Sequence, residues 1–170
     1  TFDKINPNID ALKTISEKKF PVINDEKGDI MMQEIENARM DCDSVGGVIE
    51  CVAVGLKAGI GEPMFDGLEN KISSAVFGVP AVKGIEFGNG FDATTLFGSQ
   101  NNDEFYYDND TVKTRTNNHG GILGGISSGM PLYFKVALKP TPSIAKEQNS
   151  VSFSEKKNAK LIIKGRHDPC

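Results

Sequence analysis

The stretch TNNHGGILGGISSGMP (residues 116–131) is followed by the strand-like run LYFKVAL (132–138) and then by KPTPS (139–143). Five glycines fall between Gly120 and Gly129, and each costs backbone entropy that a plain scaffold would avoid. We interpret them as a place where the chain turns sharply and lets a planar or phosphorylated ligand come close. The KPTPS segment adds one cation and two hydroxyls on a stiffened loop, which suits a phosphate.

Structural alternatives stay open on the residues alone. Oligoglycine loops are common, and this one is not a GxGxxG pattern after a strand, so it also fits a tight structural crossing. Lys139 to Ser143 also fits a surface strand end, where the prolines terminate a sheet edge. Arg166, His167 and Asp168 follow a strand-like run and also fit a turn with a capped carboxylate.

Length and composition narrow the class of protein. A chain of 170 residues predicts a single domain over 1–170, and 38% hydrophobic with 25% charged residues is typical of a globular protein. The net charge of -4 offers no basic excess for binding nucleic acid. Neither a long apolar run nor a signal peptide is present, so we expect no membrane partner. Three cysteines without paired spacing predict neither a disulfide framework nor a metal site.

The hydrophobic pattern predicts an α+β fold of layered helices and sheet. Predicted helices cover 8–18, 27–41 and 63–77, and predicted strands cover 45–56, 82–87, 132–138, 151–153 and 160–164. A turn is expected over 146–150. The polar stretch 88–118 shows little helical or strand period, so we expect a long loop that is functional or mobile and therefore protease-sensitive without ligand.

Several polar side chains could carry chemistry, but their sequence patterns favour ordinary structural roles. His119, between two asparagines and two glycines, is expected to be a hydrogen-bonding loop residue rather than a catalyst. Glu62, Asp66 and Glu69 would lie on one face of the helix predicted over 63–77, as a solvated surface. The acidic run from Asp103 to Asp110 lacks calcium-loop spacing and is expected to be solvated loop.

Several motifs together resemble the chorismate synthase family. They are DSVGGVIE (43–50), GEPMFD (61–66), PAVKGIEFGNGF (80–91), the stretch 116–144, and KGRHDPC (164–170). They cover residues 41 to 170 in the family's order. Each motif alone is weak, but the set is specific, and it implies a chorismate synthase sandwich of helices and sheet that is incomplete in this chain.

The resemblance implies an activity and its cofactor. Chorismate synthase removes phosphate from 5-enolpyruvylshikimate-3-phosphate in a 1,4-elimination that also takes a C6 hydrogen, and it requires reduced FMN. The family is a phosphate lyase of the shikimate pathway and aromatic amino acid biosynthesis, cytoplasmic and usually homotetrameric. The reductant that supplies the flavin, an NADP-linked one included, stays open.

The resemblance also assigns residues. Those implied for holding FMN are Pro80, Ala81, Gly124, Lys139, Pro140, Thr141, Pro142, Ser143 and Arg166. Arg166 and Asp168 are implied as the catalytic pair where flavin meets substrate, because an arginine attracts the anionic substrate and lowers the carboxyl pKa beside it. Pro80 departs from the asparagine common in relatives, which leaves a backbone contact intact but not a side-chain one.

Other family motifs do not occur in the sequence. The two histidine motifs, the Arg-Ser-Ser-Ala-Arg segment and several substrate-binding arginines are missing, and the chain starts without methionine and stops inside a motif. We therefore expect a piece of a longer enzyme, without its N-terminal part and C-terminal tail, that has little or no turnover alone. One alternative is a structural or oligomerising core module that no longer binds flavin tightly. Another is an ordinary flavin reductase, for which no nicotinamide site is seen.

Overall fold

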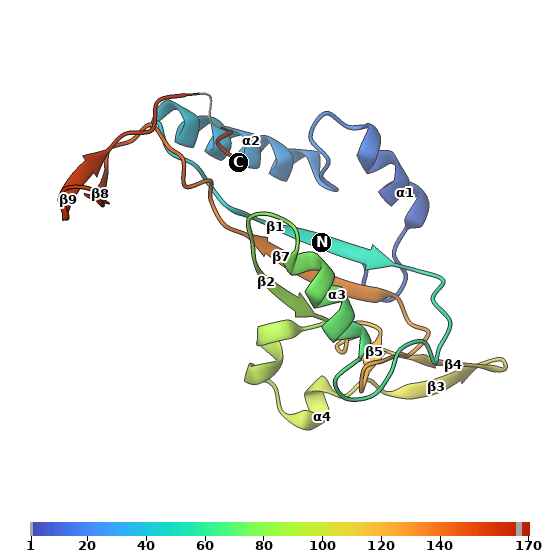
Figure 1. Ribbon diagram of the computed structural model, residues 1–170. Coiled ribbons are helices and arrows are strands. Elements are labelled where there is room, and N and C mark those ends of the chain that lie inside the picture. Colours follow the sequence, from blue (N-terminus) through green and yellow to red (C-terminus); the bar gives the residue numbers. More distant parts are fainter. Residues whose placement is uncertain (1, 166–167) are drawn as a thin grey trace. The chain divides into compact units, whose positions relative to one another are not determined.

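The structure of the chain is a computed structural model that describes residues 2–165 and 168–170 (Figure 1). The chain divides into two compact units, the first formed by residues 1–23 and 48–137 and the second by residues 24–47 and 138–170. A single domain over 1–170 stays a prediction. Among the described residues, no helix is both long and apolar enough to cross a membrane.

The elements confirm the α+β class. The first unit holds α1 (Ile9–Lys13), the 3-10 helix η1 (Thr14–Glu17), β1 (Gly47–Ala53), α3 (Leu68–Phe77), β2 (Val82–Phe87), the 3-10 helix η2 (Gly90–Thr95), α4 (Gly98–Asn101), β3 (Phe105–Asp108), β4 (Thr111–Thr114), β5 (Ile122–Leu123), β6 (Ile126–Ser127) and β7 (Leu132–Leu138). The second unit holds α2 (Asp25–Met40), β8 (Gln148–Ser152) and β9 (Lys157–Leu161). Strands β1 and β7 cross the boundary between the units, because Gly47 of β1 and Leu138 of β7 belong to the second unit.

The core of the first unit lies around strand β7. This strand is the middle one in the sheet order β1-β7-β2 (Figure 1). Its central position explains why buried and exposed residues alternate only weakly along it, and why Leu132, Tyr133 and Val136 are all buried. Helix α3 packs along β2. The strands predicted over 82–87 and 132–138 are confirmed with the same bounds.

Capping residues explain the first two helices. Asn8 accepts the Ala11 N–H at the start of α1, and Asn24 accepts the Lys27 N–H at 2.8 Å at the start of α2. The helix predicted over 27–41 is confirmed as α2. The one predicted over 8–18 is confirmed as α1 followed by the tighter η1, so its second half is 3-10 rather than α.

The third predicted helix begins later than its sequence pattern suggests. Helix α3 starts at Leu68 instead of Pro63, because Phe65 adopts φ 83, in the left-handed region that a helix cannot include. Glu62 and Asp66 therefore lie outside the helix, and the prediction that they share a helical face with Glu69 is wrong.

The stretch 88–118 is more ordered than predicted. It contains η2, α4 and an antiparallel hairpin in which β3 pairs with β4 through Asp108↔Thr111. The two residues between these strands form a tight turn, with Asn109 at φ 52. Each element is only four to six residues long, too short to show a period in the sequence.

A second antiparallel hairpin forms in the second unit. Strand β8 begins at Gln148, inside the turn predicted over 146–150, and β9 occupies 157–161 rather than 160–164. Both strands are rich in Asn, Ser and Lys, residues of low strand propensity. Cross-strand pairing from Gln148↔Leu161 to Ser152↔Lys157 therefore decides the bounds instead of side-chain type.

The N-terminal segment packs on strand β7 through Tyr133. The Tyr133 hydroxyl donates to Glu50 Oε1 at 3.2 Å, and the Lys4 ammonium lies 4.8 Å from the centre of its ring. The Phe2 ring meets Tyr133 edge-on, with ring centres 5.3 Å apart. Phe2 and Lys4 thus cover Tyr133, which is only 1% exposed.

We expect Tyr133 to make the fold sensitive to alkali. Burial, reinforced by the Glu50 carboxylate, raises the pKa of Tyr133 from 10.0 to about 12. The unfolded chain therefore loses this proton first, and the stability that the group contributes is complete below its unfolded pKa and lost as the pH rises through the folded value. Between these pKa values the free energy of unfolding should fall by roughly 2 kcal/mol. Urea titrations across this range should show a shallower fall for Tyr133→Phe; equal slopes would contradict the assignment.

Candidate functional site

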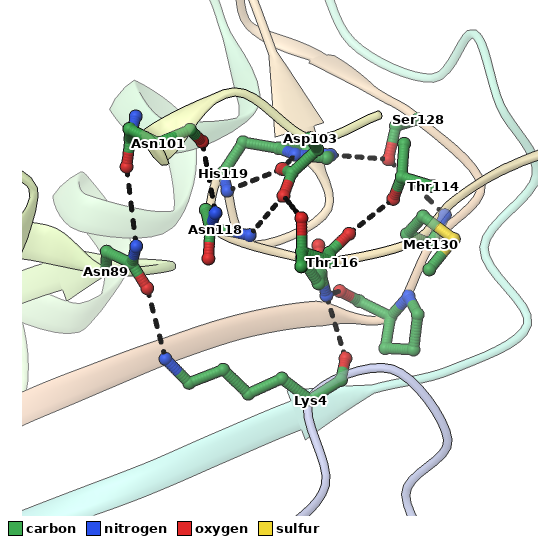
Figure 2. A network of polar contacts seen from close by, with 12 residues as sticks. Lys4, Asn89, Asn101, Asp103, Thr114, Thr116, Asn118, His119, Ser128 and Met130 are labelled. Carbon is green, nitrogen blue, oxygen red and sulfur yellow. Dashed lines mark hydrogen bonds and ion pairs between the residues drawn. The ribbon is translucent and has the colours of Figure 1, made fainter. Parts of the chain in front are cut away.

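A buried carboxylate organises the loops of the first unit. The Asp103 side chain is 4% exposed and lies between α4 and β3. Its Oδ1 accepts the Asn118 N–H at 2.8 Å and the Thr116 hydroxyl at 2.5 Å, and its Oδ2 accepts the His119 N–H at 3.1 Å and also contacts His119 Nδ1 (Figure 2). Four donors from residues 116–119 therefore converge on one carboxylate, which fixes this loop.

His119 links this carboxylate to Ser128. The contact between Nδ1 and Asp103 assigns the ring proton to Nδ1, so Nε2 accepts from the Ser128 hydroxyl, 3.2 Å away (Figure 2). Burial lowers the pKa of His119. The prediction that His119 is a hydrogen-bonding loop residue is confirmed. The prediction that the run from Asp103 to Asp110 is solvated is wrong for Asp103, whose side chain is buried. The local sequence could not show this, because the partners of Asp103 lie 13 to 16 residues away in the sequence.

The glycine-rich stretch forms the small hairpin of β5 and β6. Its turn is Gly124–Gly125, with φ 58 and 86, as two-residue hairpin turns require. Ser127 fastens the hairpin to the preceding loop, since its N–H donates to Ile60 O at 2.8 Å and its hydroxyl to Lys57 O at 2.6 Å. The Leu68 N–H donates to Gly125 O at 2.9 Å.

Most of these glycines are required by the chain's own packing. A Cβ would lie 2.4 Å from Gly88 N at Gly120, 2.5 Å from Pro131 O at Gly121, and 2.3 Å from Glu62 O at Gly125. For these three glycines the alternative of a tight structural crossing applies, rather than the interpretation that they let a ligand come close. Gly124 differs, because it is exposed and a Cβ there would have no atom of the chain within 4 Å.

Pro80 and Ala81 lie just before strand β2. Pro80 is exposed and Ala81 is half-buried. Ala81 adopts φ 69, an unfavourable value for a residue with a Cβ. Backbone strain of this kind concentrates at functional sites. The residues predicted for the flavin in the first unit thus occupy two separate loops, 80–81 and 124.

The remaining predicted residues belong to the second unit. The backbone of 139–143 is held by its surroundings: the Ser44 hydroxyl donates to Thr141 O at 2.7 Å, and Gln148 Nε2 donates to Pro142 O at 3.3 Å. Lys139 and Pro140 are exposed, and Ser143 is half-buried. Within the described ranges, Lys139 has no carboxylate partner, which leaves its ammonium available for an anion.

The loop 43–46 brings this segment close to the C-terminal motif. Ser44 holds Thr141, and the next residue, Val45, donates its N–H to Pro169 O at 2.8 Å. Asp168, directly before Pro169, is exposed. Arg166 and His167 lie outside the described residues. This bridging role of Ser44 and Val45 was not predicted, although both residues belong to the DSVGGVIE motif.

The predicted residues fit a flavin phosphate as a donor set. An exposed ammonium on Lys139 and the two hydroxyls of Thr141 and Ser143 stand on a backbone in which the carbonyls of Thr141 and Pro142 are already bonded. Gly124 leaves space where a ligand can approach the backbone. No cluster of three or more His, Cys, Asp or Glu side chains suited to a metal ion occurs in the described part of the chain.

Comparison with known proteins gives a consistent result. The family model for chorismate synthase matches residues 3–170. A chorismate synthase of Dehalococcoides mccartyi is 52% identical over 140 residues, which is 82% of this chain and 38% of that protein. A chorismate synthase of Methanococcus maripaludis is 44% identical over 168 residues, 99% of this chain and 45% of that protein.

A solved structure agrees with the sequence relatives. The crystal structure of a chorismate synthase superposes with a TM-score of 0.73 at 30% identity, covering 79% of this chain and 41% of that chain. The chain thus spans less than half the length of the curated relatives described above. Since the family model matches almost the whole chain and the fold agrees, this protein belongs to the chorismate synthase family.

Proposed function

We propose that this chain carries part of the flavin side of a chorismate synthase. The activity is the 1,4-elimination of phosphate from 5-enolpyruvylshikimate-3-phosphate, with loss of a C6 hydrogen, to give chorismate. The observation that carries the proposal is Lys139, which is exposed and has no carboxylate partner among the described residues. It stands on the segment 139–143, which Ser44 and Val45 connect to the C-terminal motif. Because hydrogen bonds already hold the backbone of this segment in place, binding of an anionic ligand costs less ordering entropy there.

Each predicted residue has a role in this proposal. Lys139, Thr141 and Ser143 bind the FMN phosphate, and Pro140 and Pro142 restrict the backbone that presents them. Pro80, Ala81 and Gly124 offer backbone that the flavin can approach. Arg166 holds the anionic substrate beside the flavin, and Asp168 holds a proton there. Bound by these residues, reduced FMN would supply electron density to the substrate and would help to take up its C6 proton.

The proposal extends to the setting of the whole enzyme. It includes a cytoplasmic location, the shikimate pathway and a homo-oligomer, a tetramer in the full enzyme. The sequence lacks the family's histidine motifs and substrate-binding arginines, so we propose that this chain alone has little or no turnover. Product formation at a full enzyme's rate by the 170-residue chain would contradict this part.

Lys139→Ala is expected to weaken FMN binding by roughly ten- to hundredfold, because a charge-assisted hydrogen bond to a phosphate is lost. Flavin fluorescence titrations of the 170-residue chain measure this affinity. Lys27→Ala, which removes an exposed lysine on α2, is the matched control and should bind as the unmodified chain does.

Two outcomes would count against the flavin site. Equal affinity of Lys139→Ala and Lys27→Ala would show that Lys139 does not bind the phosphate. Absence of saturable binding by the unmodified chain would instead favour the alternative, a structural core that does not complete the flavin site.

A further inference from the structure

The hairpin that carries Gly124 needs support from outside itself. Strands β5 and β6 have two residues each, and an isolated hairpin of this size is not stable in water. Ser127 attaches one side of the hairpin to the loop 57–60. The next residue, Ser128, attaches the chain elsewhere: its N–H donates to Gly121 O at 2.9 Å, and its hydroxyl meets His119.

Asp103, His119 and Ser128 form a continuous chain of side-chain contacts, here called the relay. The side chains of Asp103 and His119 are 4% and 10% exposed. Asp103 orients the His119 ring, and His119 Nε2 then accepts a hydrogen bond from the Ser128 hydroxyl. The relay thus joins the segment after α4 to the C-terminal base of the β5–β6 hairpin (Figure 2).

The same order of side chains activates a nucleophile in serine hydrolases. Here the Ser128 oxygen also accepts the Met130 N–H, at 3.3 Å. Its hydroxyl therefore both donates and accepts inside the loop, which suits a residue that holds the backbone in place. This engagement favours positioning over nucleophilic attack.

We propose that His119 and Ser128 are positioning residues that fix the Gly124 turn for the flavin. The inference rests on the proposed flavin contact at Gly124. Gly124 is exposed and has little of the chain near it, whereas Gly125, the other residue of the turn, is buried and accepts the Leu68 N–H. The location of Gly124 therefore depends on Gly125 and on the residues at the base of the hairpin. Ser127 sets its position relative to the loop 57–60, and the relay sets it relative to the residues around Asp103. Loss of the relay should leave the fold intact but loosen the turn.

Hydrogen–deuterium exchange tests the relay without any ligand. In Ser128→Ala, the Ser127 and Leu68 amides, which donate to Ile60 O and Gly125 O, should exchange roughly tenfold faster through local opening. The Tyr133 amide in β7, bonded to Gly120 O, serves as the internal reference and should stay protected. Ser128→Thr keeps the hydroxyl and should restore slow exchange.

Thr116→Val is the matched control. It removes another donor to Asp103 but leaves the contact between His119 and Ser128 in place. Its hairpin amides should exchange at the unmodified rate, even if its overall stability falls. Equal acceleration in Thr116→Val, or no acceleration in Ser128→Ala, would overturn the proposal.

Flavin titration separates this inference from the proposed function. If Lys139→Ala and Ser128→Ala both weaken FMN binding while Thr116→Val does not, the positioning role is supported. If Lys139→Ala weakens binding and Ser128→Ala does not, the flavin site stands and the positioning role for it is overturned. If the unmodified chain binds no FMN, the flavin contact fails on this chain and the flavin half of the inference is overturned with it; exchange still decides whether the relay holds the turn.

Discussion

Replacement of Gly88 by alanine is expected to lower the free energy of unfolding by about 3 kcal/mol or more. Gly88 adopts φ 58 directly after strand β2. A Cβ there would lie 2.0 Å from Asn118 O and 2.7 Å from Gly120 N. Both are backbone atoms, so no side-chain rotation can relieve the clash. The loop 117–121 would have to move, together with the Gly88 N–H that donates to Tyr133 O at 3.1 Å.

Gly47→Ala is the matched control for this prediction. An added Cβ at Gly47, the first residue of β1, has nothing within 4 Å, and its φ lies outside the left-handed region. Urea unfolding followed by circular dichroism should give a change of about 0.5 kcal/mol or less for this variant. If Gly88→Ala unfolds at the same urea concentration as Gly47→Ala, the close approach of the two loops is wrong.

The sequence predicted the central strands well because their patterns are local. Strand β7 is a mainly apolar run that follows Pro131, and β2 mixes apolar and charged residues before Gly88. Such short patterns between turn residues need no distant partner to be recognised. The helices α1 and α2 begin at asparagine caps that are also local. The start of α3 could not be predicted, because the residue type of Phe65 does not indicate its left-handed φ, and because the 61–67 loop packs against Gly125, which is distant in the sequence.

The residues of the candidate site likewise differ in how well the local sequence predicts them. Lys139, Gly124 and the C-terminal motif could be predicted as site residues because they stand in continuous motifs. Asp103 was missed because it lies among other polar residues of a low-period stretch, and its importance arises only from donors at 116–119. The sequence alone also does not distinguish a glycine that backbone packing requires from one that leaves space for a ligand. Only the neighbouring atoms distinguish Gly125 from Gly124.

The largest effect of a polar substitution is expected at Asp103. Asp103→Asn preserves the shape of the side chain but turns one acceptor oxygen into an NH2 donor. Each carboxylate oxygen now accepts two hydrogen bonds, one of them from a backbone N–H. Either amide orientation therefore places the new NH2 group against the N–H of Asn118 or of His119, neither of which can become an acceptor. We expect a loss of about 3 kcal/mol in the free energy of unfolding, since buried donors left without an acceptor bear their full desolvation cost.

The matched control is Asp110→Asn, which makes the same chemical change at an exposed residue of the turn between β3 and β4. Its stability should change by about 0.5 kcal/mol or less. Thr116→Val separates the contributions further: it removes one of the four donors but leaves the carboxylate, so its loss should be about 1 kcal/mol. A graded order, with Asp103→Asn most destabilised, Thr116→Val intermediate and Asp110→Asn unchanged, follows only if residues 116–119 depend on this carboxylate. Equal stability of the Asp103 and Asp110 variants would mean that the loop is held by its glycine contacts alone, and that the relay to Ser128 has no fixed base.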